Sequence, residues 1–251
     1  MRRVLGLTLT GLGVFFVVLA LLMRFYLPGQ IVKFPLNWYS VTTLTGQNMT
    51  YFSPKPFQEF SGVSMRAMST LDGDVGAGNS STAVWNEITG VQDLTNHLPV
   101  AYISQRSAFN RRTGELVNCC GAHVNSNTTA RQSGQGYVWP IGTQQQSYQV
   151  FNPTLLRPVP AYYQGSATID GLTTYEFIEQ VTSQKIGVQK VPGALFGASQ
   201  QYVTLPEYLT GTYTYWVDPV TGTPLKVSED QTEWLATAAG DTRLIDRKSV
   251  V

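Results

Sequence analysis

The chain has 251 residues, of which 43% are hydrophobic and only 13% are charged, with 17 basic and 16 acidic side chains. A soluble domain usually carries about a quarter charged residues, so the polar surface of this chain must come mostly from Ser, Thr, Asn and Gln. A net charge of +1 provides no broad electrostatic field for a polyanion, which argues against nucleic acid as a partner.

The N-terminus contains an uncharged apolar run at residues 4–23, flanked by Arg2, Arg3 and Arg24. About 20 apolar residues at ~1.5 Å each match the ~30 Å hydrocarbon core of a bilayer, which predicts one transmembrane anchor. A cleavable signal peptide is the alternative, but its apolar region is typically ~7 to 15 residues long and precedes a small-x-small site, which this stretch lacks. The positive-inside rule then predicts a cytoplasmic stub at residues 1–3 and export of the rest.

The exported part is predicted to be mainly β. Residues 24–38 contain prolines that disfavour helix and indicate a juxtamembrane linker. Beyond it, short segments rich in β-branched and aromatic residues are separated by Gly, Pro, Asn and Asp, which predicts an antiparallel domain at 39–251 with a curved-sheet, sandwich or barrel-like form. Prolines at 153–160 could divide it into two lobes. The expected strands include residues 81–88, 100–109, 148–151, 173–181 and 212–217.

Two turns share a pattern, "AFNRRTGELVN" at 108–118 and "WVDPVTGTPLKV" at 216–227. In each, Asn110 or Asp218 opens the turn through its side chain, and a glycine four residues later supplies a positive φ before the next strand. These segments are predicted to be hairpins and not catalytic loops.

Familiar catalytic motifs are missing, because the sequence contains no G-x-S-x-G, H-E-x-x-H, P-loop or G-x-G-x-x-G. Asp72 and Asp74 resemble the start of a calcium loop, but the later ligand positions are absent, and a glycine-rich hairpin is the better interpretation. Glu176 and Glu179 would point to opposite faces of a strand and are expected to be solvated or sheet-edge charges. We therefore expect a protein without catalytic activity, cofactor or metal.

Cys119 and Cys120, with His123 three residues later, form the one cluster that suggests redox or metal chemistry. Zinc needs three or four ligands, and the only other histidine is distant in sequence. A disulfide between neighbours closes almost no loop, so the chain-entropy mechanism has little to act on. In an oxidising compartment, a vicinal disulfide that holds a turn ranks first, a redox switch second and pairing with another protein third.

The segment from Lys185 to Tyr202 is apolar and rich in Gly and Pro, with Lys185 and Lys190 at one end. An ordinary long β connection whose Leu195 and Phe196 fill core space is one interpretation. The other is a hydrophobic loop at the mouth of a lipid cavity or against the membrane, where lysines remain solvated beside inserted apolar groups.

The order of motifs resembles the actinobacterial family often labelled the porin PorA family. The resemblance rests on "GDVGAGNSSTAVW", "FNRRTGELVNCCG", "GYVWPIGTQQQSY", "IDGLTTYEF" and "YWVDPVTG", together with the N-terminal apolar run. It implies an actinobacterial envelope protein anchored in the plasma membrane. Members, among them a mycobacterial polar growth factor, are linked to polar growth, lipoglycan maturation and trehalose monomycolate trafficking beside a mycolate transporter. The family's cysteine pair falls on Cys119 and Cys120, and no residue takes a catalytic role.

The end of the chain departs from the family pattern. Family members carry a second membrane helix near the C-terminus, whereas this chain ends in "GDTRLIDRKSVV" without an apolar run after Trp234. We therefore expect a C-terminal truncation.

The leading functional prediction is a non-enzymatic, membrane-anchored β protein that binds or hands on a lipid or glycolipid beside an envelope-lipid transporter or another membrane protein. Burial of acyl chains on an apolar concave face would supply most of the affinity. A scaffold of the growth machinery that binds no ligand is the first alternative and a channel is the second, disfavoured because the expected strands are short and polar on both faces. The residues expected to line the ligand site are Leu195, Phe196, Tyr213, Tyr215 and Trp216.

Overall fold

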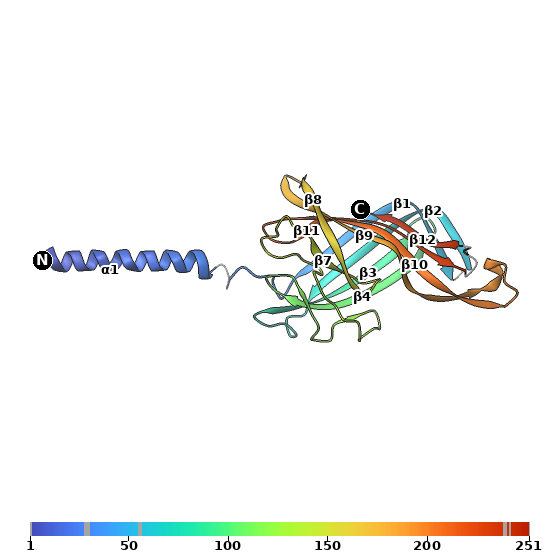
Figure 1. Ribbon diagram of the computed structural model, residues 1–251, viewed down its shortest axis with the longest axis horizontal. Coiled ribbons are helices and arrows are strands. Elements are labelled where there is room, and N and C mark those ends of the chain that lie inside the picture. The colour runs from blue at the N-terminus through green and yellow to red at the C-terminus, as the bar shows by residue number, and fades with distance from the viewer. Residues whose placement is uncertain (1, 28–30, 55–56, 238–239, 241, 251) are drawn as a thin grey trace. The chain divides into compact units, whose positions relative to one another are not determined.

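The computed structural model describes residues 2–27, 31–54, 57–237, 240 and 242–250 (Figure 1). Its contacts divide the chain into two compact units, Met1–Phe34 and Pro35–Val251. The first unit is helical and the second contains the β-sheet.

The N-terminal unit is a long apolar helix. Helix α1 (Arg2–Leu21) continues as a π-helical turn, η1 (Leu22–Tyr26). The stretch Thr8–Tyr26 has a mean hydropathy of 2.1, and none of it is buried. This length and apolarity are compatible with a membrane anchor and also with a signal sequence. Arg24 lies inside the helical segment and not after it, which a membrane tolerates near a helix end because the long side chain reaches the interface.

The β unit is one antiparallel sheet that curls into a half-barrel (Figure 1). The strand order is β5-β4-β3-β2-β1-β12-β11-β10-β9-β8-β7, with β6 also paired to β4. The first and last strands are therefore neighbours in the sheet. The bounds are β1 (Tyr39–Pro54), β2 (Phe57–Gly73), β3 (Thr82–Asp93), β4 (Leu98–Asn110), β5 (Leu116–Val117), β6 (His123–Val124), β7 (Tyr148–Asn152), β8 (Arg157–Ile169), β9 (Leu172–Pro192), β10 (Tyr202–Val217), β11 (Pro224–Ala236) and β12 (Thr242–Val250), with the 3-10 turn η2 (Gly193–Phe196) between β9 and β10.

The predicted mainly β, antiparallel fold is confirmed, but the strands are longer than predicted. Apart from Ser81, which precedes β3, the five expected strand segments lie in β3, β4, β7, β9 and β10. Strand β9, however, has 21 residues and β10 has 16. Pairing continues between Val191 and Val203 far beyond the predicted end of β9 at residue 181. The added length is rich in Gln and Lys. Antiparallel strands can be exposed to water, so this part of the hairpin keeps its backbone hydrogen bonds although its side chains are polar.

Both predicted turns are present. The carboxamide oxygen of Asn110 accepts the backbone N–H groups of Arg112 and Thr113 at 2.9 and 3.1 Å, and the N–H of Gly114 donates to the Asn110 carbonyl at 2.9 Å. Asp218 accepts equivalent bonds in the turn between β10 and β11, and Gly222 N–H donates to its carbonyl at 2.8 Å. Gly114 and Gly222 have φ values of 70° and 74°, as the shared pattern predicts.

The core lies on the concave face of the sheet. Along β9 and β10, alternate side chains point inward, so that Phe177 pairs with Tyr215 and Glu179 with Tyr213. Three buried clusters follow this face. Their buried members are Met49, Tyr51, Val63, Met65 and Val91 in the first, Trp139, Val150, Ala161, Phe177 and Val217 in the second, and Val159, Val181, Leu209 and Tyr213 in the third.

A segment without regular structure connects the two edges of the sheet. Residues 134–142, called the strap below, lie between β6 and β7. The carbonyl of Gly134 accepts the N–H of Leu116 at 2.8 Å, while Gln135 N–H donates to Gln149 O at 2.6 Å and Gln135 O accepts Phe151 N–H at 2.8 Å. Because β5 and β7 stand at opposite ends of the strand order, these bonds join the two edges of the half-barrel.

Candidate functional site

The strap places an indole ring inside the half-barrel. Its backbone is held by the two hairpin turns, since Ile141 N–H donates to Arg112 O at 2.9 Å and Trp139 N–H donates to Gly222 O at 2.7 Å. The ring of Trp139 stacks on Phe177 with centroids 5.9 Å apart and tilts against Tyr215 at 5.0 Å. A loop residue thus packs on the concave face against the paired strands β9 and β10.

Aromatic rings surround Trp139 on the inner face of β7 to β10. Tyr148 and Tyr163 meet Phe177 edge-on at 5.7 and 5.9 Å, and Tyr163 meets Tyr175 at 5.5 Å. The tyrosines are only partly buried, while Phe177 and Trp139 are 0% and 1% exposed. Rings with polar edges and apolar faces suit a ligand that has both kinds of surface.

A buried carboxyl group lies beside these rings. Glu179 is 0% exposed, and its Oε1 accepts a hydrogen bond from Asn152 Nδ2 at 2.8 Å while its Oε2 accepts one from the Tyr215 hydroxyl at 3.0 Å. Asn152 is itself held in place, because its Oδ1 accepts the backbone N–H groups of Thr154 and Leu155, both at 3.1 Å. Side chains from β7, β9 and β10 therefore form one hydrogen-bonded polar cluster among the apolar side chains of this face.

Two opposing effects act on this carboxyl group. Burial raises the pKa of Glu179, because the charged form loses its hydration, and the nearby Glu229 carboxylate raises it further. The hydrogen bonds from Asn152 and Tyr215 favour the ionised form and lower the pKa, but burial outweighs them. A proton at Glu179 is thus held more tightly in the folded chain than in solvent.

The five predicted ligand residues do not lie together. Tyr213 and Tyr215 share the inner face, where the Tyr213 hydroxyl also donates to Gln231 Oε1 at 2.9 Å. Trp216 points to the outer face, where its Nε1 donates to Glu176 Oε2 at 2.9 Å and Lys226 Nζ lies 4.9 Å from its ring centroid. Their role in ligand binding stays a prediction.

Leu195 and Phe196 lie in η2, at the opposite end of the β9–β10 hairpin from Tyr215. Phe177 pairs with Tyr215 and Pro192 with Tyr202, and at ~3.3 Å per residue these two levels are roughly 45–50 Å apart along the strand. Leu195 and Phe196 therefore cannot line the same pocket as the inner tyrosines.

The expectation for Glu179 is wrong. The spacing of Glu176 and Glu179 predicts solvated or sheet-edge charges, but Glu179 is fully buried, whereas Glu176 accepts the Trp216 bond on the outer face. Burial is possible because two donors satisfy the two carboxyl oxygens. The signal in the sequence is the alternation Tyr175, Phe177, Glu179, Val181, which places the carboxyl group in phase with apolar side chains.

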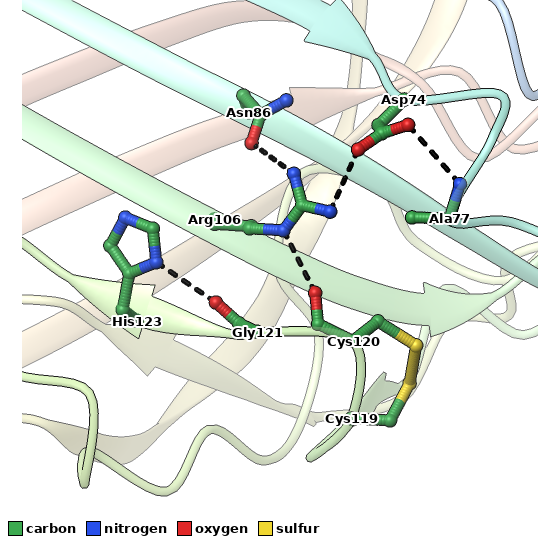
Figure 2. A network of polar contacts seen from close by, with 8 residues as sticks. All are labelled: Asp74, Ala77, Asn86, Arg106, Cys119, Cys120, Gly121 and His123. Atoms are coloured by element: carbon green, nitrogen blue, oxygen red, sulfur yellow. Dashed lines mark hydrogen bonds and ion pairs between the residues drawn. A yellow bond between two sulfur atoms is a disulfide. The ribbon is translucent and has the colours of Figure 1, made fainter.

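The cysteine pair forms a disulfide on the outer face. Cys119 and Cys120 are joined to each other (Figure 2). Ala122 N–H donates to Cys119 O at 3.0 Å across the turn. Cys120 has a φ of 62°, a left-handed conformation that side chains other than glycine rarely adopt. His123 Nδ1 contacts the Gly121 carbonyl at 2.9 Å, so the histidine belongs to the turn.

Arg106 anchors this turn to the sheet (Figure 2). Its guanidinium donates from Nε to the Cys120 carbonyl, from Nη1 to Asn86 Oδ1 and from Nη2 to Asp74 Oδ2, each at 2.8 Å. The Arg106 side chain is 18% exposed, and the hydrogen bond that it makes, aided by the Ala77 N–H, lowers the pKa of Asp74. The arrangement supports the interpretation of the disulfide as a clip on a turn.

We expect the guanidinium to contribute more to stability than the disulfide does. Replacing both cysteines with serine should change the free energy of unfolding by less than ~1 kcal/mol, because the bond closes almost no loop. Arg106→Met should cost about 2 kcal/mol, since it leaves three acceptors without their donor. Urea unfolding of the purified full chain in mild detergent, followed by tryptophan fluorescence, measures both. A larger loss for the cysteine variant would contradict this ranking.

A known protein family matches nearly the whole chain. The family model for porin PorA matches residues 5–249. This chain belongs to the porin PorA family. The match includes most of the helix, all but the last residue of the sheet, the strap and the cysteine turn, and so it confirms the resemblance noted from the sequence motifs. Among curated proteins, none matches this porin PorA chain significantly.

Proposed function

We propose that the β unit of this porin PorA chain binds a membrane lipid or glycolipid on its concave face. It would help to move that molecule during envelope assembly and polar growth in an actinobacterium, without catalysing a reaction. An envelope-lipid transporter or another membrane protein would deliver or receive the lipid. The observation that carries the proposal is the amphipathic inner face, where aromatic rings surround hydrogen-bonding groups.

The chemistry of that face fits a molecule with apolar chains and a polar head. Phe177 and Trp139 are buried beneath this face, and the partly buried Tyr148, Tyr163 and Tyr215 present their rings and hydroxyl groups on it. Burial of a methylene against such surface contributes about 0.8 kcal/mol, so acyl chains would supply most of the affinity. The polar groups would then select the head group.

The apolar helix supports a location of this protein at the membrane. We propose that it is an uncleaved, single-pass anchor in the plasma membrane, with the N-terminus in the cytoplasm and the β unit outside. The support is the stretch Thr8–Tyr26 with a mean hydropathy of 2.1 and the basic Arg2 and Arg3 before it.

A channel is the weaker candidate, although the argument from short strands is wrong. Strands of 21 and 16 residues in β9 and β10 are long enough to cross a membrane. The distribution of apolar side chains between the two faces of the sheet still argues against a pore, because a membrane barrel turns its apolar side chains outward. In this sheet the apolar clusters lie inside. The outer positions of β10 and β11 hold the aromatic Tyr208, Trp216 and Trp234, but most are polar, namely Thr210, Thr212, Thr214, Lys226, Ser228 and Asp230.

A scaffold that binds no ligand is the second candidate, and one observation favours it. Met49 and Met65 are each 1% exposed and Val63 is 3% exposed, so β1 and β2 contribute a densely packed core. Such packing needs no ligand to be stable. The scaffold differs from the lipid carrier in one respect that can be measured, which is whether purified protein retains lipid.

The test compares adjacent residues on opposite faces of β10. Full-length protein is purified in mild detergent, exchanged into glycolipid-containing micelles, washed, and extracted for mass spectrometry. We expect the wild type and Trp216→Ala to retain about one lipid per chain and Tyr215→Ala to retain at least tenfold less. Circular dichroism checks that both variants are folded. Retention of no lipid by the wild type would reject the proposal in favour of the scaffold.

A further inference from the structure

The outer face of the sheet carries an exposed apolar patch that the inner site does not use. Val41, Met68, Ile88 and Tyr102 come from β1, β2, β3 and β4, and they are 51%, 50%, 47% and 67% exposed. These four residues are called the outer patch below. Isolated exposed apolar side chains are common, but a contiguous group on neighbouring strands marks an interaction surface.

The register of the strands shows that the outer patch is continuous. In one row Val41 pairs with Thr70, Thr70 with Ile88 and Ile88 with Ser104; in the next, Thr43 pairs with Met68, Met68 with Gly90 and Gly90 with Tyr102. Neither row contains a charge. Gly90 stands among the larger side chains with no atom near the place where a Cβ would be, which leaves room for a side chain from another surface.

Charges of opposite sign border the outer patch on β2. The outer side chains along this strand are Arg66, Met68, Thr70 and Asp72 in order, and both charged residues are exposed. Within the part of the chain that the structure describes, the Arg66 guanidinium makes one hydrogen bond, from Nη2 to Gln92 Oε1 at 3.2 Å, so its other donors remain available. On β2, the two uncharged rows thus lie between the positive charge of Arg66 and the negative charge of Asp72.

This charge order is self-complementary. If a two-fold axis runs across the strands between Met68 and Thr70, β2 of one copy faces β2 of the other in the opposite direction. Arg66 of each copy then meets Asp72 of the other copy, which gives two such pairs around an apolar centre. A two-fold axis along the strands would instead place Arg66 against Arg66, which is repulsive.

We infer that the outer patch is the docking surface for a second copy of this chain, arranged with that crosswise two-fold axis. Face-to-face packing of two sheets is a common way to bury such rows. Four strands at ~4.8 Å spacing and a similar length along each strand give a footprint of roughly 20 Å by 20 Å. This is smaller than the about 800 Å² per partner of a standard interface, so the dimer is weak and transient.

The test is a charge exchange on the full-length chain in detergent, followed by analytical ultracentrifugation over a range of protein concentrations. Arg66→Asp and Asp72→Arg should each weaken dimerisation at least tenfold, because each places like charges together at two symmetric positions. The double variant Arg66→Asp with Asp72→Arg should restore the wild-type dissociation constant. Ile88→Glu should abolish the dimer, whereas Tyr162→Glu, on the outer face of β8, should not.

Several results would overturn the inference. The wild type could remain monomeric at every concentration, or the charge exchange could fail to rescue the single variants. A dimer that survives Ile88→Glu would be held elsewhere in the chain. Binding to lipid vesicles that Ile88→Glu abolishes, without any dimer, would assign the patch to the membrane surface. None of these outcomes depends on whether the inner face holds lipid, so the inference stands apart from the proposed function.

Discussion

Replacing Gly222 with alanine is expected to lower the free energy of unfolding by about 3 kcal/mol or more. The backbone there has a φ of 74°, and an added Cβ would collide with the carbonyl oxygen of Trp139 and lie 2.7 Å from that of Pro140. The left-handed conformation alone costs about 1–2 kcal/mol for a residue with a Cβ. The rest of the loss comes from moving the strap, whose N–H at Trp139 donates to Gly222 O.

Gly142 provides a matched control for this prediction. It belongs to the same strap and has a φ of 78°, but a Cβ added there would meet no atom within 4 Å. Gly142→Ala should therefore show only the cost of the backbone conformation, about 1–2 kcal/mol. Urea unfolding and near-ultraviolet circular dichroism of both variants, which report stability and the packing of Trp139, distinguish the two contributions. Equal losses would mean that the strap does not hold the turn.

The elements that depend on neighbouring residues could be predicted from the sequence. The hairpin turns at Asn110 and Asp218 are built by side-chain bonds within three residues and by a glycine that follows. The helix is recognisable from one apolar run. Strand positions follow from alternation, as in β10, where Tyr213 and Tyr215 share the inner face.

Features that depend on distant pairing could not be predicted. Nothing near Thr50 in the sequence indicates that β1 pairs with β12, because Thr50 and Arg247 are partners only through the closure of the whole sheet. The role of Gln135 is equally non-local, because its backbone N–H and its carbonyl both form hydrogen bonds with β7. Periodicity shows which face a side chain occupies but not which strand lies beside it.

The candidate site also combines features that the sequence predicts with features that it does not. Alternation along β10 separates Trp216 from Tyr215, so the expected set of five ligand residues conflicts with the strand pattern of the same segment. Trp139 lies in a loop, and loops have no period from which its burial could be predicted. Glu179 escapes prediction because a charged residue is normally placed outside, a rule that fails when two donors are held in position for it.

Substitutions of Glu179 should separate the loss of its hydrogen bonds from the loss of its charge. Glu179→Ala should destabilise the fold by about 3 kcal/mol, because Asn152 Nδ2 and the Tyr215 hydroxyl lose their acceptor and a cavity remains. Glu179→Gln keeps the shape and an acceptor, so it should lie within about 1 kcal/mol of the wild type at neutral pH. Glu176→Gln, on the outer face of the same strand, is the control.

The pH dependence gives the sharper result. The pKa of Glu179 is raised in the folded chain, so this group contributes full stability below the ordinary carboxyl pKa of about 4.3 and loses it as the pH rises through the folded-state value. Glu179→Gln should therefore become more stable relative to the wild type as the pH increases from about 4 to 8. Glu87, whose pKa burial also raises, follows the same sign and is present in both proteins, so it cancels in the comparison. A difference that is flat with pH would show that the pKa of Glu179 is not shifted by folding. A glutamine variant that becomes less stable relative to the wild type as the pH rises would show that Glu179 is held as a stabilising carboxylate.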